Sequence, residues 1–184
     1  MKCFAPWHSI LVRFNGDIVP DGVYLKRYGN VLQTPLNDLL NSFTASYTRD
    51  SIRAGHLPPE CQQCALKEAS VGHSRRKFFE DILNPMLENT NYDYSKNFTD
   101  IYFLEFNMSN ICNLKCRMCD GINSSAWVKD DLKLAKNGNP YFRRVADPEF
   151  GYTNKSQEII QRLFEDPEPF MNLRYLSIKG GEPY

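Results

Sequence analysis

The sequence predicts an α/β protein that begins with a small, cysteine-containing α+β module. Apolar residues alternate on both sides of Asn15-Gly16, which is typical of a β-hairpin. Between that hairpin and residue 90, apolar residues recur mainly at helical spacing. Beyond residue 100 the order is strand, helix, helix, strand, and a crossover of this kind makes the two strands parallel.

The hairpin and the first helix open the module. Residues 10–23 alternate around Asn15-Gly16, and Pro20 limits the second strand because proline cannot donate to a sheet. Thr34-Pro35 joins a cap residue to a proline suited to the first helical turn, so we expect a helix from there to about Gly55. Its predicted apolar face comprises Leu36, Leu39, Leu40, Phe43 and Tyr47.

A further helix is expected between Cys64 and Pro85. Its apolar stripe, which indicates core packing, comprises Phe78, Phe79, Ile82 and Leu83. The basic run Arg75-Arg76-Lys77 is typical of a solvated helix face. Residues 91–100 belong to a polar stretch rich in Asn, Asp, Tyr and Ser, so we predict a linker there between a module at 1–90 and a second part at 101–184.

The second part begins with a strand over 101–108 that is dense in aromatic and β-branched residues and is expected to be buried on both faces. A helix capped by Ser124 or Ser125 should end near Gly138, and a loop insertion is expected over 139–152. The last strand is expected over 173–179. The helix before it has an apolar face of Ile159, Ile160, Leu163 and Phe164.

The composition excludes several classes of protein. There are 22 Lys and Arg against 22 Asp and Glu, so no global charge draws the chain to nucleic acid or to an anionic membrane. No apolar run approaches the roughly 18 residues of a spanning helix. Residues 1–7 lack the charged start and apolar core of a signal peptide. We therefore expect a cytoplasmic protein that binds neither nucleic acid nor membrane.

The six cysteines fall into two groups. Cys3, Cys61 and Cys64 form a first cysteine set, and Cys112, Cys116 and Cys119 form a second cysteine set. A reducing cytosol does not favour disulfides. Grouping in threes is more typical of metal ligands than of scattered core cysteines.

The second cysteine set has a spacing, C-x3-C-x2-C, that brings three thiolates to one centre. A cubic iron-sulfur cluster normally takes four thiolates, so three leave one iron open to a reactant. A structural zinc ion takes four protein ligands, and no fourth Cys or His stands near Cys119 in sequence. The set also follows a predicted parallel strand, at the end where α/β folds place active sites. An iron-sulfur cluster is therefore favoured over zinc.

Three features together resemble the radical S-adenosylmethionine (SAM) superfamily: the strand over 103–107, the cysteine loop, and Gly180-Gly181-Glu182-Pro183 after the last strand. The resemblance implies that residues 101–184 form the first strand-helix units of a partial (β/α)6 TIM-like barrel. It also implies a [4Fe-4S] cluster on Cys112, Cys116 and Cys119, and a SAM methionyl site lined by Gly180, Gly181, Glu182 and Pro183. Before the third cysteine the family usually has an aromatic residue. Here Met118 takes that place and can pack on adenine.

The same resemblance implies the reaction. SAM is cleaved by one electron to methionine and a 5'-deoxyadenosyl radical, which abstracts hydrogen from a substrate. An external one-electron reductant is needed, and relatives with auxiliary clusters point to a peptide or protein substrate. No catalytic residue is assigned. Because only the first strand-helix units are present, we expect the sequence to be an N-terminal fragment of a longer enzyme or to be completed by a second chain.

The first cysteine set resembles the auxiliary-cluster modules called SPASM and twitch. The matching residues are Cys3-x2-Pro6, the hairpin at Gly16, Gly29-Asn30, and Pro59-Glu60-Cys61-Gln-Gln-Cys64. The resemblance implies an auxiliary iron-sulfur cluster on Cys3, Cys61 and Cys64, with one iron open or bound by Asp21. Zinc with His8 or His56 as fourth ligand stays open. A non-catalytic zinc- or iron-sulfur-binding interaction module is the alternative function.

Overall fold

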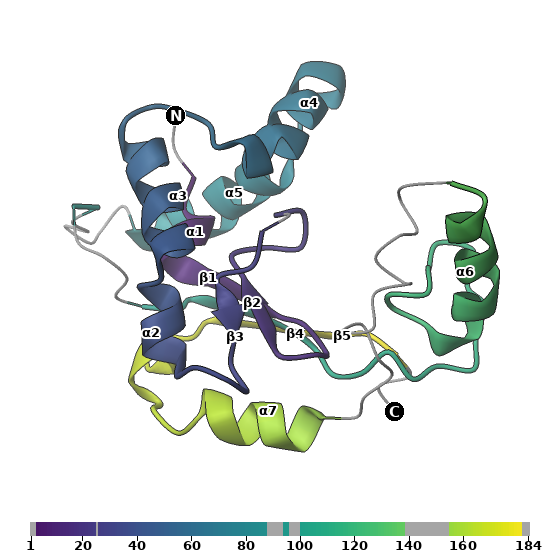
Figure 1. The fold of residues 1–184 in the computed structure, drawn as a ribbon. Coiled ribbons are helices and arrows are strands. Elements are labelled where there is room, and N and C mark those ends of the chain that lie inside the picture. Colours follow the sequence, from purple (N-terminus) through teal and green to yellow (C-terminus); the bar gives the residue numbers. More distant parts are fainter. Residues whose placement is uncertain (1–2, 25, 88–93, 96–99, 139–154, 182–184) are drawn as a thin grey trace.

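The protein folds around one mixed β-sheet of five strands in the order β3-β2-β1-β4-β5 (Figure 1). The computed structural model describes residues 3–24, 26–87, 94–95, 100–138 and 155–181. The strands are β1 (Ser9–Val12), β2 (Asp17–Val19), β3 (Gly29–Asn30), β4 (Phe103–Asn107) and β5 (Tyr175–Lys179). The predicted α/β class is thus confirmed as a mixed α/β fold.

Helices lie on both faces of the sheet (Figure 1). Those of the N-terminal module are α1 (Ala5–His8), α2 (Leu36–Leu40), α3 (Phe43–Arg53), α4 (Gln62–Val71) and α5 (Arg75–Leu87). Those of the second part are α6 (Val128–Lys136) and α7 (Ser156–Leu163). Short 3-10 turns are η1 (Pro59–Cys61), η2 (Ser125–Trp127) and η5 (Glu168–Phe170).

Two apolar cores result from the period-two alternation of the central strands. Leu104 and Phe106 of β4 belong to the core that contains residues of α2 and α7. Phe103 points to the opposite face, where it packs on Phe79 and Leu83 of α5. Burying both faces explains why β4 consists almost entirely of buried residues, as predicted.

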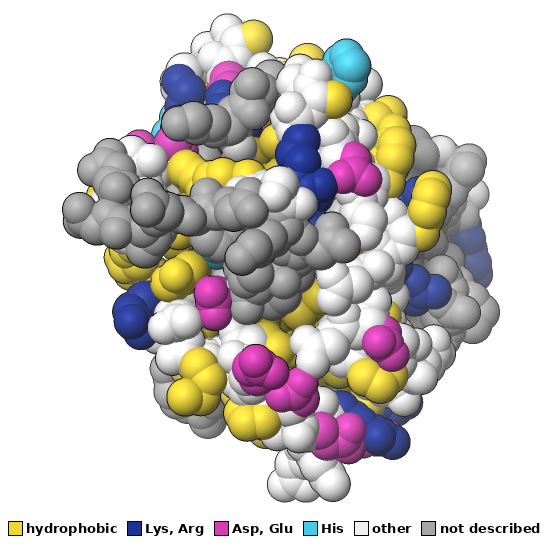
Figure 2. All heavy atoms as spheres, turned by 90° about the vertical axis from the view of Figure 1, so that its left-hand side faces the viewer, with side chains coloured by type: hydrophobic (Ala, Val, Ile, Leu, Met, Phe, Trp, Pro, Cys, Tyr) yellow, Lys and Arg dark blue, Asp and Glu magenta, His cyan; other side chains and the backbone are white. Residues whose placement is uncertain are grey.

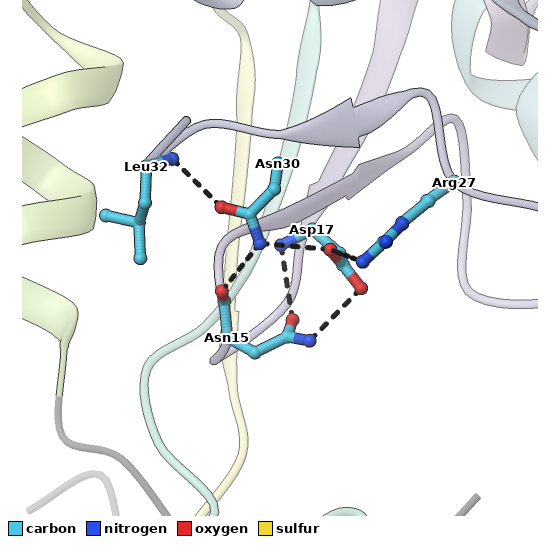
Figure 3. A network of polar contacts seen from close by, with 5 residues as sticks. All are labelled: Asn15, Asp17, Arg27, Asn30 and Leu32. Atoms are coloured by element: carbon cyan, nitrogen blue, oxygen red, sulfur yellow. Dashed lines mark hydrogen bonds and ion pairs between the residues drawn. The ribbon is translucent and has the colours of Figure 1, made fainter. Parts of the chain in front are cut away.

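The hairpin at Asn15-Gly16 is confirmed, since β1 pairs antiparallel with β2. A polar network stabilises the turn and joins β3 to β2, with which it pairs antiparallel (Figure 3). The Asp17 carboxylate accepts from Arg27 at 2.9 Å and from the Asn30 amide at 3.0 Å. The Asn30 amide also donates to the Asn15 carbonyl oxygen at 2.9 Å. These bonds satisfy a buried carboxylate at the start of β2.

Parallel pairing of β4 with β5 is also confirmed, with Phe103 beside Tyr175 and Asn107 beside Lys179. An unpredicted feature is that β1 pairs parallel with β4. The sheet therefore runs without a break from the N-terminal module into the second part. Residues 91–93 and 96–99 of the predicted linker lie outside the described residues.

The helical predictions for the module were wrong in detail. The first helix is broken at Asn41-Ser42, where the Ser42 side chain accepts from the Ala45 backbone N–H and starts α3. Because a new helix starts at Phe43, this side chain does not continue the apolar face of α2. Phe43 is 82% exposed. The second predicted helix is two helices separated at Gly72, and α5 continues past Pro85 to Leu87.

In the second part, α6 starts at Val128, and neither Ser124 nor Ser125 caps it. Their hydroxyls bond to the cysteine loop instead. The predicted loop insertion over 139–152 lies outside the described residues. None of the helices in the described ranges is long and apolar enough to cross a membrane. The face in Figure 2 intersperses acidic, basic and apolar side chains, as the balanced composition suggests.

Candidate metal centres

The fold brings the first cysteine set together. Cys3 precedes α1, Cys61 ends η1, and Cys64 lies in the first turn of α4. All three line one narrow cavity between the start of the chain, the loop after β2 and the helices α4 and α5. The charged side chains that line the same cavity are Asp21, Glu60 and Arg76.

Burial dominates the chemistry of these thiols. It raises the pKa of Cys3 and of Cys64, and it raises the pKa of Cys61 to about 12. The negative charge of Asp21 adds to the increase at all three. Three thiols and two carboxylates line this cavity. These donors suit an iron-sulfur cluster, whose iron ions bind thiolates and displace the thiol protons.

The two carboxylates of the cavity are held differently. Asp21 is buried, and its Oδ1 accepts from the backbone N–H groups of Val23 at 2.6 Å and Tyr24 at 3.1 Å. Burial raises the pKa of Asp21 as well. Glu60 has a buried Oε2 with no hydrogen-bond partner in the part of the chain that the structure describes.

The histidines considered as zinc ligands lie elsewhere. The His8 ring is buried, with Nδ1 3.0 Å from the Asp100 carbonyl oxygen. His56 is exposed. Neither histidine lines the cavity of the first cysteine set. Within the described ranges, no group of three or more His, Cys, Asp or Glu side chains is arranged to hold a metal ion.

The second cysteine set lies on the loop between β4 and η2, close to α6 and apart from α3, α4 and α5 (Figure 1). Two residues of η2, Ser125 and Trp127, hold this loop by hydrogen bonds. The Ser125 hydroxyl accepts from the Cys112 N–H at 3.0 Å and donates to the Cys112 carbonyl oxygen at 2.9 Å. Trp127 Nε1 donates to the Cys116 carbonyl oxygen at 3.0 Å.

The thiols of the second set are more accessible. Cys116 and Cys119 are exposed, and Cys112 is half-buried. The pKa of Cys119 is raised by partial burial and then by the charges of Cys116, Asp120 and Cys112. The Leu114 N–H donates to Cys112 Sγ at 3.4 Å, a contact of the kind that tunes iron-sulfur ligands. Met118 is almost fully exposed.

The double glycine lies directly against this loop. Gly180 and Gly181 have φ angles of +87° and +61°, which favour glycine. A methyl group on Gly180 would stand 2.7 Å from the Ser109 carbonyl oxygen, and one on Gly181 would stand 2.8 Å from that of Ile111. Glycines are therefore needed for the two backbones to approach each other. Glu182 and Pro183 lie outside the described residues.

A polar cavity of about 340 Å³ lies next to the cysteine loop. Its walls come from the hairpin, from β4 and β5, and from the cysteine loop. The lining polar residues include Arg13, Glu105, Asn107, Asp120, Asn123 and Lys179. Glu105 is buried and is paired with Arg75 at 3.2 Å and with Lys179 at 2.9 Å. This carboxylate connects α5 with the residue that precedes the double glycine.

Sequence reasoning missed these cavity residues. The signal available was a Glu inside an otherwise apolar strand, since buried charges are rare unless they are paired. It also missed two asparagines whose polar atoms are buried without partners among the described residues: Oδ1 of Asn107 and both amide atoms of the fully buried Asn110. Both lie within five residues of Cys112.

Comparison with known families identifies the first region. Residues 3–65 match the family model of the SPASM iron-sulfur cluster-binding domain. The match begins at Cys3 and ends just after Cys64, so it contains the whole first cysteine set. SPASM domains bind iron-sulfur clusters and occur in radical SAM enzymes. The match covers about a third of the chain.

The match does not extend to the second cysteine set or to the double glycine. None of the curated proteins and none of the solved structures compared with the chain matches it.

Proposed function

We propose that the chain is a radical SAM enzyme, or the part of one that holds its cofactors. In this proposal Cys112, Cys116 and Cys119 hold a [4Fe-4S] cluster, and the cluster's open iron binds SAM. Gly180, Gly181, Glu182 and Pro183 line the methionyl end of SAM, and Met118 packs on its adenine. When bound, this pair supplies the 5'-deoxyadenosyl radical that removes hydrogen from a substrate.

The observation that carries the proposal is the approach of two motifs that are distant in sequence. Gly180 and Gly181 lie in van der Waals contact with the backbone that leads into Cys112. The Gly181 N–H donates to the Asn123 carbonyl oxygen at 3.3 Å, on the far side of the cysteine loop. The double glycine therefore lies beside both the start and the end of the loop that carries the second cysteine set.

The sheet supports the barrel that the resemblance implies. In a barrel, cofactors bind at the carboxyl ends of parallel strands. The second cysteine set follows β4 and the double glycine follows β5, two parallel neighbours. Leu176 and Ile178 of β5 remain about half exposed, so this face of the strand offers apolar surface for further packing.

The segment that matches the SPASM model, residues 3–65 (the SPASM segment), would hold an auxiliary iron-sulfur cluster on Cys3, Cys61 and Cys64, with Asp21 nearby. An external one-electron reductant would serve both clusters. The cavity of about 340 Å³ next to the cysteine loop has room for part of a polar substrate. Its paired charges and amide groups suit a peptide or protein segment.

Anaerobic reconstitution tests the proposal. The chain, loaded with iron and sulfide, is titrated with SAM while optical and EPR spectra are recorded. We expect a change in the spectrum of the reduced cluster on SAM binding and reductive formation of 5'-deoxyadenosine. Cys116→Ala should abolish both effects, whereas Cys64→Ala should remove the auxiliary cluster and leave the SAM-dependent spectrum.

Recovery of about one zinc per chain, with no spectral response to SAM, would refute the proposal and favour a non-catalytic interaction module. Retained SAM cleavage in Cys116→Ala would refute the assignment of the second cysteine set.

A further inference from the structure

We propose that Glu60 is the fourth ligand of the auxiliary cluster in the SPASM segment. The inference rests on the proposed auxiliary site and names the residue that completes it. Three cysteines leave one iron of a cubic cluster without a protein ligand. Two carboxylates line the same cavity as the cysteines, Asp21 and Glu60.

Glu60 has an oxygen available for a metal. Its Oε2 is buried and accepts no hydrogen bond from the residues that the structure describes. A buried carboxylate oxygen without a donor is costly, and native proteins compensate it with a donor, a water or a cation. An iron ion in the adjoining cavity supplies that compensation.

The position of Glu60 fits this role. It precedes Cys61 within η1, so one short rigid turn presents a carboxylate and a thiol beside the cavity. Both Glu60 and Cys61 line the cavity. Coordination forms one Fe–O bond to the ionised carboxylate and changes no oxidation state.

Asp21 is already engaged in a structural role. Its Oδ1 accepts from two backbone N–H groups, at 2.6 and 3.1 Å, and thereby fixes the turn after Pro20. Moving this oxygen to a metal would leave two backbone donors unpaired, so Asp21 could reach a metal only through its other oxygen, Oδ2. Arg76 is occupied as well, since its guanidinium bonds to Glu68 and lies 3.7 Å from Glu80.

A Glu60 ligand separates the chemistry of the two clusters. The auxiliary cluster then has a protein ligand on every iron and no position for an exogenous reactant. The second cysteine set keeps its open iron for SAM. The auxiliary site is thus an electron carrier, and substrate or SAM binding is confined to the other site.

The test uses the full chain in which Cys112, Cys116 and Cys119 are replaced by Ala, so that only the auxiliary set can hold iron. Glu60→Gln, Glu60→Cys and the matched control Asp21→Asn are made in this background and in the chain with all six cysteines. Each protein is reconstituted anaerobically. Iron and sulfide are counted, and Mössbauer and EPR spectra are recorded before and after mild oxidation.

We expect about four irons per auxiliary cluster in the parent and in Asp21→Asn. Glu60→Gln should fall to about three irons on mild oxidation and show the EPR signal of an oxidised three-iron cluster. Glu60→Cys should restore about four irons, which distinguishes loss of a ligand from loss of folding.

Two results would overturn the inference. One is a Glu60→Gln protein that keeps four irons and the parent spectrum. The other is loss of the fourth iron in Asp21→Asn alone, which would assign the ligand to Asp21. If the parent itself binds no iron and the six-cysteine chain loses none on mutation of Cys61, the proposed auxiliary site is wrong, and Glu60 loses its role with it.

Discussion

The two cysteine sets are built in opposite ways. The second set is local: three cysteines of one loop are held by hydrogen bonds from Ser125 and Trp127, and two of the thiols are exposed. The first set is assembled by the tertiary fold, from the start of the chain and from the junction of η1 and α4. Its thiols share a cavity in which burial raises the pKa of each one.

This difference explains how each site depends on the rest of the molecule. A loop with fixed spacing keeps its ligands together even if distant packing weakens. A site that unites residues 3, 61 and 64 exists only while the segments before α1 and around η1 and α4 keep their tertiary contacts. The cysteines of the first set are half-buried or buried, whereas Cys116 and Cys119 of the second set are exposed.

Thiol labelling of the reduced, metal-free chain should show the contrast most strongly. Raising the pKa of Cys61 from its ordinary value of 9.0 to about 12 lowers its thiolate fraction about a thousandfold, and the thiolate is the nucleophile. We expect maleimide to label Cys116 and Cys119 first and the SPASM cysteines last, as measured by mass mapping over time. In urea all six should react at similar rates. Equal rates for Cys61 and Cys116 in the folded chain would contradict the contrast.

Loss of core packing should affect the first site before the second. Phe79 is fully buried, and its ring lies 5.2 Å from that of Phe103 in edge contact. Phe79→Ala should lower the free energy of unfolding by about 3–5 kcal/mol, measured by denaturant titration. Reconstituted iron at the SPASM segment should fall more than iron at the second set.

Phe43→Ala is the matched control, because this aromatic side chain is 82% exposed and should change stability by less than about 0.5 kcal/mol. Equal loss of iron at both sites in Phe79→Ala would show that the cysteine loop also depends on the core.

The same contrast governs what could be predicted from sequence. Local patterns predicted the hairpin at Asn15-Gly16, the strands β4 and β5, and the C-x3-C-x2-C loop, because spacing and alternation act over a few residues. The parallel direction of β4 and β5 followed from the crossover between them. The grouping of Cys3 with Cys61 and Cys64 in one site followed from the resemblance to auxiliary-cluster modules. The pairing of β1 with β4 was not predictable, since it joins strands about 90 residues apart and depends on which apolar faces meet.

Polar residues in the core were missed for a related reason. Glu60, Glu105 and Asn107 are surface-type residues in sequence, and only the tertiary fold places their polar atoms in buried positions. The break in the first helix at Asn41-Ser42 was missed because the leucine pattern before it continues in phase with Phe43. The Ser42 side chain accepts from the Ala45 N–H, and this local hydrogen bond interrupts the helix and starts α3.

Acid should weaken the N-terminal region through His8. Burial lowers the pKa of His8 from 6.5 to about 4. The unfolded chain takes up this proton as the pH falls through 6.5, while the folded chain resists it until about pH 4, so stability is lost across that interval. The loss at pH 5 should be about 2 kcal/mol, measured by denaturant titration at pH 7 and pH 5.

His8→Phe should remove most of this pH dependence, and the control His56→Phe, at an exposed position, should leave it unchanged. An unaltered pH profile in His8→Phe would assign the acid sensitivity to other groups.

A smaller effect should isolate the backbone contact on which the second site depends. Gly180→Ala forces an L side chain into φ +87° and places its methyl group 2.7 Å from the Ser109 carbonyl oxygen. Gly55→Ala is matched to it, because Gly55 has φ +78° and no atom within 4 Å of the added methyl group. Both variants carry the conformational cost of about 1–2 kcal/mol. Only Gly180→Ala should also displace the loop that leads into Cys112. We therefore expect SAM affinity of the reconstituted chain, measured by spectral titration, to fall about tenfold in Gly180→Ala and to stay unchanged in Gly55→Ala. Equal affinities would mean that the double glycine shapes the loop without shaping the SAM site.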